Sequence, residues 1–344
     1  KIWAELLGLA RVGRHDHFFE LGGHSLLAVQ LLSRAVDLGL KFSAADIFQA
    51  PVLKELASKI RLEPHPSDLD VICARATGSQ PPLFFVPTGL GDCSYVLSLV
   101  TEMDVDCPVY TLPWPPFDKA HPLTLESIAS QAILAIKQVQ SQGPYRVAGY
   151  SSGGILGYAI AQRLLKLDEA VSFIAFIDVT LPANRLNASL AQVVREVVLE
   201  SLQSLDGERF ELLQQFAKQC SIAELLEKAL QIGALPPHRD LQNQAVYERI
   251  AQFQRALQLY QVPSLPIEIH QYYAVEPLPN DRARAANTSP SPEANSPMRG
   301  WDRVLSTAAI HAVPVPGNHV TIMSIPENRK ALALSLSRAL NNSL

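Results

Sequence analysis

The stretch YRVAGYSSGG at residues 145–154 joins two different kinds of sequence. Residues 145–150 are apolar and aromatic, which predicts a buried strand, and the small residues that follow predict the start of a helix. Residues 149–153 also fit the pattern G-x-S-x-G, in which a serine occupies a strained turn between strand and helix and its Oγ points out of the sheet. Ser151 is therefore the candidate nucleophile, and the alternative is a glycine-rich turn without chemistry.

Short apolar runs and amphipathic segments alternate on both sides of this stretch. Strands are expected at 83–87, 108–112 and 171–178, and helices at 125–139 and from the turn at Ser151 to about residue 165. Such alternation is typical of a parallel sheet covered by helices on both faces. The predicted fold class is α/β.

The alternation stops after Asp178 and resumes near residue 265. Apolar positions at helical spacing between 181 and 263 predict a helical insertion, followed by strands at 265–275 and 308–315 and a closing helix over 327–340. The polar loop 277–297 has almost no apolar content, which predicts a mobile loop.

A nucleophilic serine needs a base and an acid that orients the base. In folds with this turn the chain order is serine, acid, histidine, each past a strand end. Four histidines follow Ser151: His238 falls in the insertion and His270 and His311 within strands, whereas His319 follows the strand 308–315. His319 is the candidate base. Asp178, at the end of its strand, is the candidate acid, although such a carboxylate can also cap a helix; Asp302 is the second choice.

Two backbone N–H groups are expected to bind the oxyanion. One belongs to Ser152, after the nucleophile, and the other to the loop VPTGLGDCSY at 86–95. Thr88 is the first choice in that loop and Gly89 the second. The alternative is that the glycines of the loop only turn the chain.

The first sixty residues show helical patterns only, and Pro51 is expected to start the last helix. Residues 63–70 read as a linker, followed by an edge strand. Ser25, after Gly22, Gly23 and His24, suits a helix N-cap, but residue 28 is not the Glu or Gln of a capping box. The residues alone do not decide whether a group is attached to Ser25.

Composition excludes several classes of partner. A formal net charge of −4 without a long Lys/Arg run argues against nucleic acid and against an anionic membrane surface. No apolar run is long enough to span a bilayer and no signal peptide begins the chain, so a cytoplasmic protein is expected. The four cysteines are scattered without a C-x-x-C pair, which predicts free thiols and no metal site.

The stretch FFELGGHSLLAVQLLSR at 18–34 resembles the attachment motif of peptidyl carrier domains of nonribosomal peptide synthetases, and FSAADIFQAPVLKELA resembles their third and fourth helices. The resemblance implies a four-helix bundle over 1–62, with its first helix truncated, and 4′-phosphopantetheine attached at Ser25. The histidine before Ser25 favours a peptidyl carrier over the acyl carriers of polyketide lines.

Residues 71–344 resemble the type I thioesterase domains that follow the last carrier of such assembly lines. The motifs are PLFFVPTGLGDCSY, GYSSGG, the strand ending at Asp178 and PGNHVTIM. The resemblance implies an α/β-hydrolase fold with a lid at about 181–263 and a triad of Ser151, Asp178 and His319. It does not account for the loop 277–297.

Together the two resemblances imply a terminal carrier–thioesterase didomain. A peptidyl thioester at Ser25 would pass to Ser151 and leave by hydrolysis or macrocyclisation, without a metal, in the biosynthesis of secondary metabolites such as antibiotics or siderophores. The implied partners are upstream condensation and adenylation domains and a phosphopantetheinyl transferase, and a monomer is expected. Two alternatives are a polyketide or hybrid line, and a hydrolase of free esters with a non-catalytic docking module.

Overall fold

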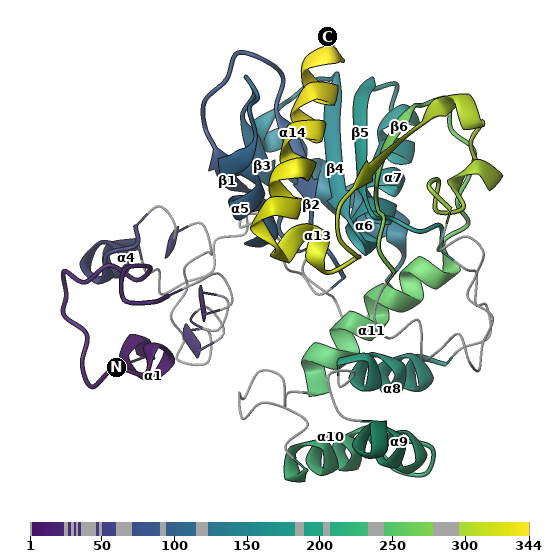
Figure 1. Ribbon diagram of the computed structural model, residues 1–344. Coiled ribbons are helices and arrows are strands. Elements are labelled where there is room, and N and C mark those ends of the chain that lie inside the picture. Colours follow the sequence, from purple (N-terminus) through teal and green to yellow (C-terminus); the bar gives the residue numbers. More distant parts are fainter. Residues whose placement is uncertain are drawn as a thin grey trace. The chain divides into compact units, whose positions relative to one another are not determined.

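The computed structural model describes residues 2–23, 27–28, 31, 34–35, 46–47, 50–59, 71–89, 94–114, 123–182, 189–201, 207–232, 244–277 and 296–343 (Figure 1). The chain forms two compact units, one made of Pro116–Ala129 with Pro182–Pro263 and the other of the remaining residues. The predicted linker 63–70 and residues 278–295 of the polar loop lie outside the described residues.

The N-terminal region contains helices α1 (Ile2–Leu7) and α4 (Leu53–Lys59), and helical residues also occur at 27–28, 31, 34–35 and 46–47. Its apolar core is formed by Trp3, Phe18, Ala28, Leu31, Ile47 and Leu56. Ser25 and His24 lie outside the described residues, and the four-helix bundle stays a prediction. The expected helix start at Pro51 is wrong: α4 begins at Leu53, because the Pro51 carbonyl accepts the Phe18 N–H and Val52 pairs with His17.

A seven-stranded sheet forms the centre of the C-terminal region, with the strand order β1-β3-β2-β4-β5-β6-β7. The strands are β1 (Ile72–Arg75), β2 (Leu83–Val86), β3 (Val109–Thr111), β4 (Tyr145–Tyr150), β5 (Val171–Ile177), β6 (Ile269–Ala274) and β7 (Ile310–Val315). All neighbours pair in parallel except β1, which is antiparallel to β3 at the edge. The predicted parallel sheet is confirmed apart from this edge strand.

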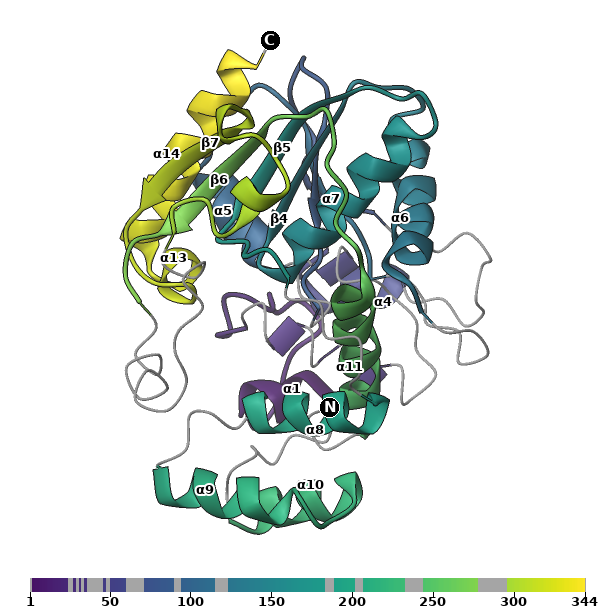
Figure 2. The same ribbon diagram turned by 90° about the vertical axis from the view of Figure 1, so that its right-hand side faces the viewer.

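Helices cover both faces of the sheet (Figure 2). On one face lie α5 (Ser94–Glu102), α13 (Thr321–Ser324) and α14 (Pro326–Asn342), and on the other α6 (Leu125–Val139) and α7 (Ser152–Leu165). Fully buried side chains from β2, β5 and β6 pack against α5 and α14 in one apolar core, including Phe85, Ile177, Tyr272, Leu99 and Leu336.

Two predicted strands begin two or more residues before the observed ones. The strands predicted at 83–87, 108–112 and 171–178 exceed the observed ones by one residue at one or both ends. The strand expected from 265 begins at Ile269, and Pro266, which cannot donate a hydrogen bond to a strand ladder, falls in the part that is lost. The strand expected from 308 begins at Ile310 because Thr307–Ala309 form a 3-10 turn, η3. Both strands otherwise occupy the predicted positions.

The chain between β5 and β6 is helical, as predicted. It contains α8 (Leu190–Ser201), α9 (Gly207–Phe216), α10 (Ile222–Gln231) and α11 (Gln244–Leu259), and α8 packs against α11. α10 begins with a capping box, in which the Ser221 Oγ accepts the Glu224 N–H and the Glu224 carboxylate accepts the Ser221 N–H. No helix among the described residues is long and apolar enough to cross a membrane.

Candidate active site

Ser151 lies at the turn between β4 and α7, in a backbone conformation that few non-glycine residues adopt (φ 52°). The turn is tight: a Cβ on Gly149 would lie 2.4 Å from the Gly153 carbonyl carbon, and one on Gly153 would lie 2.8 Å from the Val86 carbonyl oxygen. Only glycine permits this approach of strand and helix. The G-x-S-x-G pattern therefore forms the strained turn that the sequence predicted.

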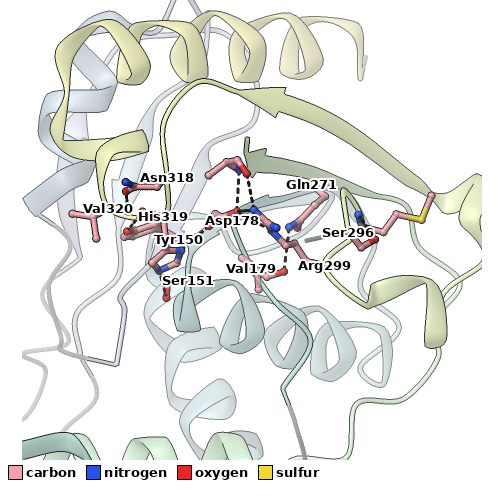
Figure 3. A network of polar contacts seen from close by, with 12 residues as sticks. Tyr150, Ser151, Asp178, Val179, Gln271, Ser296, Arg299, Asn318, His319 and Val320 are labelled. Atoms are coloured by element: carbon pink, nitrogen blue, oxygen red, sulfur yellow. Dashed lines mark hydrogen bonds and ion pairs between the residues drawn. The ribbon is translucent and has the colours of Figure 1, made fainter. Parts of the chain in front are cut away.

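His319 lies between Ser151 and Asp178 (Figure 3). Its Nε2 is 3.1 Å from the Ser151 Oγ, and its Nδ1 is 2.7 Å from the Asp178 Oδ2. These are hydrogen-bond distances. The structure thus brings together Ser151, Asp178 and His319, which follow β4, β5 and β7, with the imidazole between the serine hydroxyl and the carboxylate.

Two neighbours hold the His319 loop. The Tyr150 hydroxyl donates to the His319 carbonyl oxygen over 2.5 Å, and the two rings are stacked with centroids 5.1 Å apart. The Asn318 Oδ1 accepts the N–H group of Val320 (Figure 3) and also that of Thr321. The imidazole is therefore fixed from its ring face and from its backbone.

Asp178 directly follows β5, also in the left-handed region (φ 50°), and its side chain is 6% exposed. Its Oδ1 accepts the Ala274 N–H over 2.9 Å and two N–H groups of Arg299, from Nε over 3.0 Å and from Nη2 over 2.8 Å. Burial acts to raise the pKa of Asp178, but hydrogen bonds from His319 and Ala274 and the charge of Arg299 outweigh it and lower the pKa. The carboxylate is therefore ionised beside the imidazole.

The loop after β2 lies against the start of α7. Thr88 is buried, and the Gly89 N–H donates to the Ser152 Oγ over 2.8 Å. The predicted pair of oxyanion donors, the N–H groups of Thr88 and Ser152, belongs to these two adjoining segments. The Gly89 N–H, the second choice for the loop donor, is engaged by the Ser152 Oγ.

Among the described residues, the other candidates His270, His311 and Asp302 make no hydrogen bond with Ser151, His319 or Asp178. His270 and His311 stack on each other with ring centroids 4.8 Å apart, and His311 contacts Glu268. Asp302 is exposed on the 3-10 helix η2 (Trp301–Arg303), while Asp178 contacts the imidazole. His238 lies outside the described residues.

Two residues of the site were not found from sequence. Tyr150 stands within the serine motif, but nothing in the pattern indicates a contact with a loop near residue 319. Arg299 follows the polar loop, and the residues around it show no helical or strand periodicity. No signal in the sequence therefore indicates that it contacts Asp178.

A mixed sheet with helices on both faces and a serine at the strand-to-helix turn defines the α/β-hydrolase class. Residues 81–340 match the family described as thioesterase domain, and residues 1–60 match the family described as phosphopantetheine attachment site. The chain belongs to the thioesterase domain family, and its N-terminal region is a phosphopantetheine carrier.

Curated relatives agree with this assignment. A dimodular nonribosomal peptide synthase of Bacillus subtilis (strain 168) is 39% identical over 52% of this chain and 8% of its own length. Malpinin synthetase of Mortierella alpina is 40% identical over 52% of this chain and 2% of its own length. The chain thus spans only a small part of these relatives. Together with the two family matches they support a carrier–thioesterase didomain.

Solved structures show the same fold. A four-domain nonribosomal peptide synthetase bound to AMP and glycine has a TM-score of 0.59 at 23% identity. The match includes 98% of this chain and 25% of the synthetase chain. The thioesterase domain of Vlm2 bound with a dodecadepsipeptide has a TM-score of 0.51 at 16% identity, covering 78% of this chain and 97% of its own. At these identities the likeness concerns the fold alone.

The match at residues 1–60 indicates covalently bound 4′-phosphopantetheine. The described residues before Ser25 fit such a group: Phe18 is fully buried, Gly22 has φ 93°, and a Cβ on Gly23 would lie 2.4 Å from the Phe18 carbonyl oxygen. These contacts form a tight glycine loop anchored in the core, two residues before a serine. A serine hydroxyl is the group that phosphopantetheine esterifies, so the residues present suit it.

Proposed function

We propose that the chain releases a peptide from its own carrier region, with Ser151, His319 and Asp178 as a catalytic triad. The observation that carries the proposal is the continuous hydrogen-bonded path from the Ser151 Oγ through His319 to Asp178. This path is the arrangement by which a serine is made nucleophilic.

In the acylation step the Ser151 Oγ forms a bond to the acyl carbon of a thioester, and its proton passes to the His319 Nε2. Asp178 holds the Nδ1–H of His319 and stabilises the imidazolium. The carbon–sulfur bond then breaks, and the leaving sulfur takes the proton back from His319. The product is an acyl ester of Ser151.

The N–H groups of Thr88 and Ser152 are the proposed oxyanion donors. In comparable enzymes one such donor lowers the barrier by about 3 kcal/mol. Ser152 lies at the first position of α7, where N–H groups lack partners in the helix, and the Ser152 Oγ ties the Thr88–Gly89 segment to it. The Gly89–Ser152 hydrogen bond thus holds the two segments that carry the proposed donors together.

Release of the ester repeats the chemistry with a second nucleophile. Water gives the free acid, whereas an amine or hydroxyl of the peptide itself gives a macrocycle. In either case His319 accepts the proton of the nucleophile and returns it to the Ser151 Oγ. The helices α8, α9, α10 and α11 are the proposed lid over the acyl chain.

Ser25 is the proposed attachment residue for phosphopantetheine. When bound, the group would supply the thiol on which the peptide is carried. The proposed partners are a phosphopantetheinyl transferase and the condensation and adenylation domains of an assembly line, since the relatives are far longer than this chain.

The attachment is tested by intact mass after incubation of the full chain with coenzyme A and a phosphopantetheinyl transferase. A mass gain of one phosphopantetheine is expected for the wild type and for the control Ser33→Ala, and none for Ser25→Ala. No gain in the wild type, or a gain that survives Ser25→Ala, contradicts the assignment.

The triad is tested on the same protein loaded with an acyl-phosphopantetheine. Ser151→Ala is expected to leave the acyl group on Ser25, because the Ser151 Oγ is the proposed nucleophile against His319. Release at the wild-type rate would show that Ser151 is not the nucleophile.

A further inference from the structure

Arg299 is a buried cation in direct contact with the proposed catalytic acid. Its guanidinium donates from Nε and Nη2 to the Asp178 Oδ1, and Nη2 also donates to the Ala274 carbonyl oxygen over 2.7 Å. Arg299 is 7% exposed, and its guanidinium lies 5.9 Å from the ring centre of Tyr273. Asp178 therefore has a cation on Oδ1 and the imidazole on Oδ2 (Figure 3).

The backbone at both residues is strained and tied together. Asp178 and Arg299 have φ values of 50° and 51°, in a region that L side chains rarely adopt. The Arg299 carbonyl accepts the Leu181 N–H over 2.9 Å, and the Trp301 Nε1–H donates to the Val179 carbonyl over 2.9 Å. The segment 178–181 is thus clamped against 299–301 by main-chain and side-chain bonds.

Among the described residues, Tyr150 from β4 contacts His319, Arg299 contacts Asp178, and Tyr273 from β6 lies beside the Arg299 guanidinium. Burial, and then the Asp178 charge, raise the pKa of Tyr150, so its hydroxyl stays neutral. Of Tyr150, Tyr273 and Arg299, only Arg299 carries a permanent charge. By Coulomb repulsion it opposes a second positive charge at the Asp178 Oδ2, on the imidazole side of the carboxylate.

We propose that Arg299 is a positioning residue that fixes the Asp178 carboxylate and, through its charge, extends the reactivity of Ser151 to lower pH. Only a neutral imidazole can accept the Ser151 proton, and Arg299 shares with His319 the carboxylate that would stabilise a positive imidazole. The inference rests on the proposed triad.

The test measures the rate of Ser151 phosphorylation by diisopropyl fluorophosphate across about pH 4.5–9, a range that brackets the titration of histidine, followed by intact mass on the full chain. The Ser151 Oγ displaces fluoride from phosphorus and its proton goes to His319, so the reaction reports the triad without a chosen acyl group. Arg299→Gln keeps a hydrogen-bond donor without the charge, and Arg299→Lys keeps the charge without the planar fork. Arg303→Met, an exposed arginine on η2, is the control.

For Arg299→Gln the acid limb of the profile is expected to move upward by about one pH unit, with a plateau about tenfold lower. Arg299→Lys is expected to keep the limb at its wild-type position and to lower only the plateau. Arg303→Met should match the wild type. Thermal unfolding of each variant verifies that it is folded.

Coincident limbs for Arg299→Gln, Arg299→Lys and wild type would overturn the proposal, because a purely structural role changes the plateau alone. If the wild type is not labelled, or Ser151→Ala is labelled equally, the proposed function fails instead. The two failures are therefore distinguishable.

Discussion

Replacement of Asp178 by Asn is expected to impair both reactivity and stability. The Ala274 N–H and Arg299 both donate to Oδ1, so the amide oxygen of Asn takes that position and the NH₂ group faces His319. The His319 Nδ1 must then accept rather than donate. The proton moves to Nε2, which faces the Ser151 Oγ and no longer serves as a base.

The expected loss of reactivity is about 10⁴-fold, the magnitude for a triad locked in the wrong tautomer. Stability falls for a different reason: the Arg299 charge stays buried beside a neutral amide. Removal of one partner of a buried ion pair costs about 3 kcal/mol or more, and we expect a loss of that size for Asp178→Asn.

The double variant Asp178→Asn/Arg299→Met separates the two effects. An apolar side chain removes the uncompensated cation, so about 2 kcal/mol of the lost stability should return while phosphorylation of Ser151 stays slow. Urea denaturation gives the unfolding free energies, and labelling by diisopropyl fluorophosphate gives the rates. Asp302→Asn, an exposed acid, should stay within about 0.5 kcal/mol of wild type.

The reasoning is refuted if Asp178→Asn unfolds at the wild-type urea concentration and labels within tenfold of the wild-type rate. It is also refuted if the double variant is no more stable than the single one, because the Arg299 charge would then not be the source of the loss.

Three further changes follow from the same contacts. Tyr150→Phe removes the hydroxyl that donates to the His319 carbonyl but keeps the stacked ring. Urea denaturation should show a loss of about 1 kcal/mol in the free energy of unfolding, and the labelling rate should fall less than tenfold. A larger fall in the rate would mean that the hydroxyl does more than support the loop. Ser152→Ala frees the Gly89 N–H and should slow labelling about tenfold with little change in unfolding temperature, whereas an unchanged rate would separate the Gly89 contact from catalysis. Burial, and then the neighbouring His311, lower the pKa of His270 from 6.5 to about 4. As the pH falls from 6.5 toward 4 the unfolded chain therefore binds a proton at this histidine before the folded chain does, and the free energy of unfolding decreases. His270→Phe should remove at most about 3 kcal/mol of this decrease, and an equal pH dependence of the two proteins would contradict the prediction.

The local parts of the site were predictable because their signals are local. Strand, glycine turn and helix around Ser151 lie within about ten residues, and a strained turn needs those small residues wherever the motif occurs. His319 and Asp178 were found by elimination, since parallel strands bring their carboxyl ends to one edge of the sheet. Chain order and strand ends therefore sufficed to predict that these three side chains lie together; their catalytic roles stay a proposal.

Other features depend on contacts that no periodicity encodes. α5 was not predicted because SYVLSLVTE carries the β-branched residues of a strand, and packing against α14 decides for the helix. The antiparallel direction of β1 follows from its pairing with β3, which the short run at 72–75 does not reveal. Both depend on residues distant in the chain.

Arg299 shows the same limit at the site itself. Among the described residues, four non-glycine positions have positive φ, and three of them, Ser151, Asp178 and Arg299, belong to one hydrogen-bonded set with His319. Such conformations persist only where surrounding contacts outweigh their cost. For Arg299 these contacts are the ion pair with Asp178 and the hydrogen bonds between segments 178–181 and 299–301. The buried ion pair therefore helps to maintain the strained backbone, and that backbone places the guanidinium beside Asp178. A sequence pattern reports neither, because each has meaning only once β5 and the segment 299–301 are side by side.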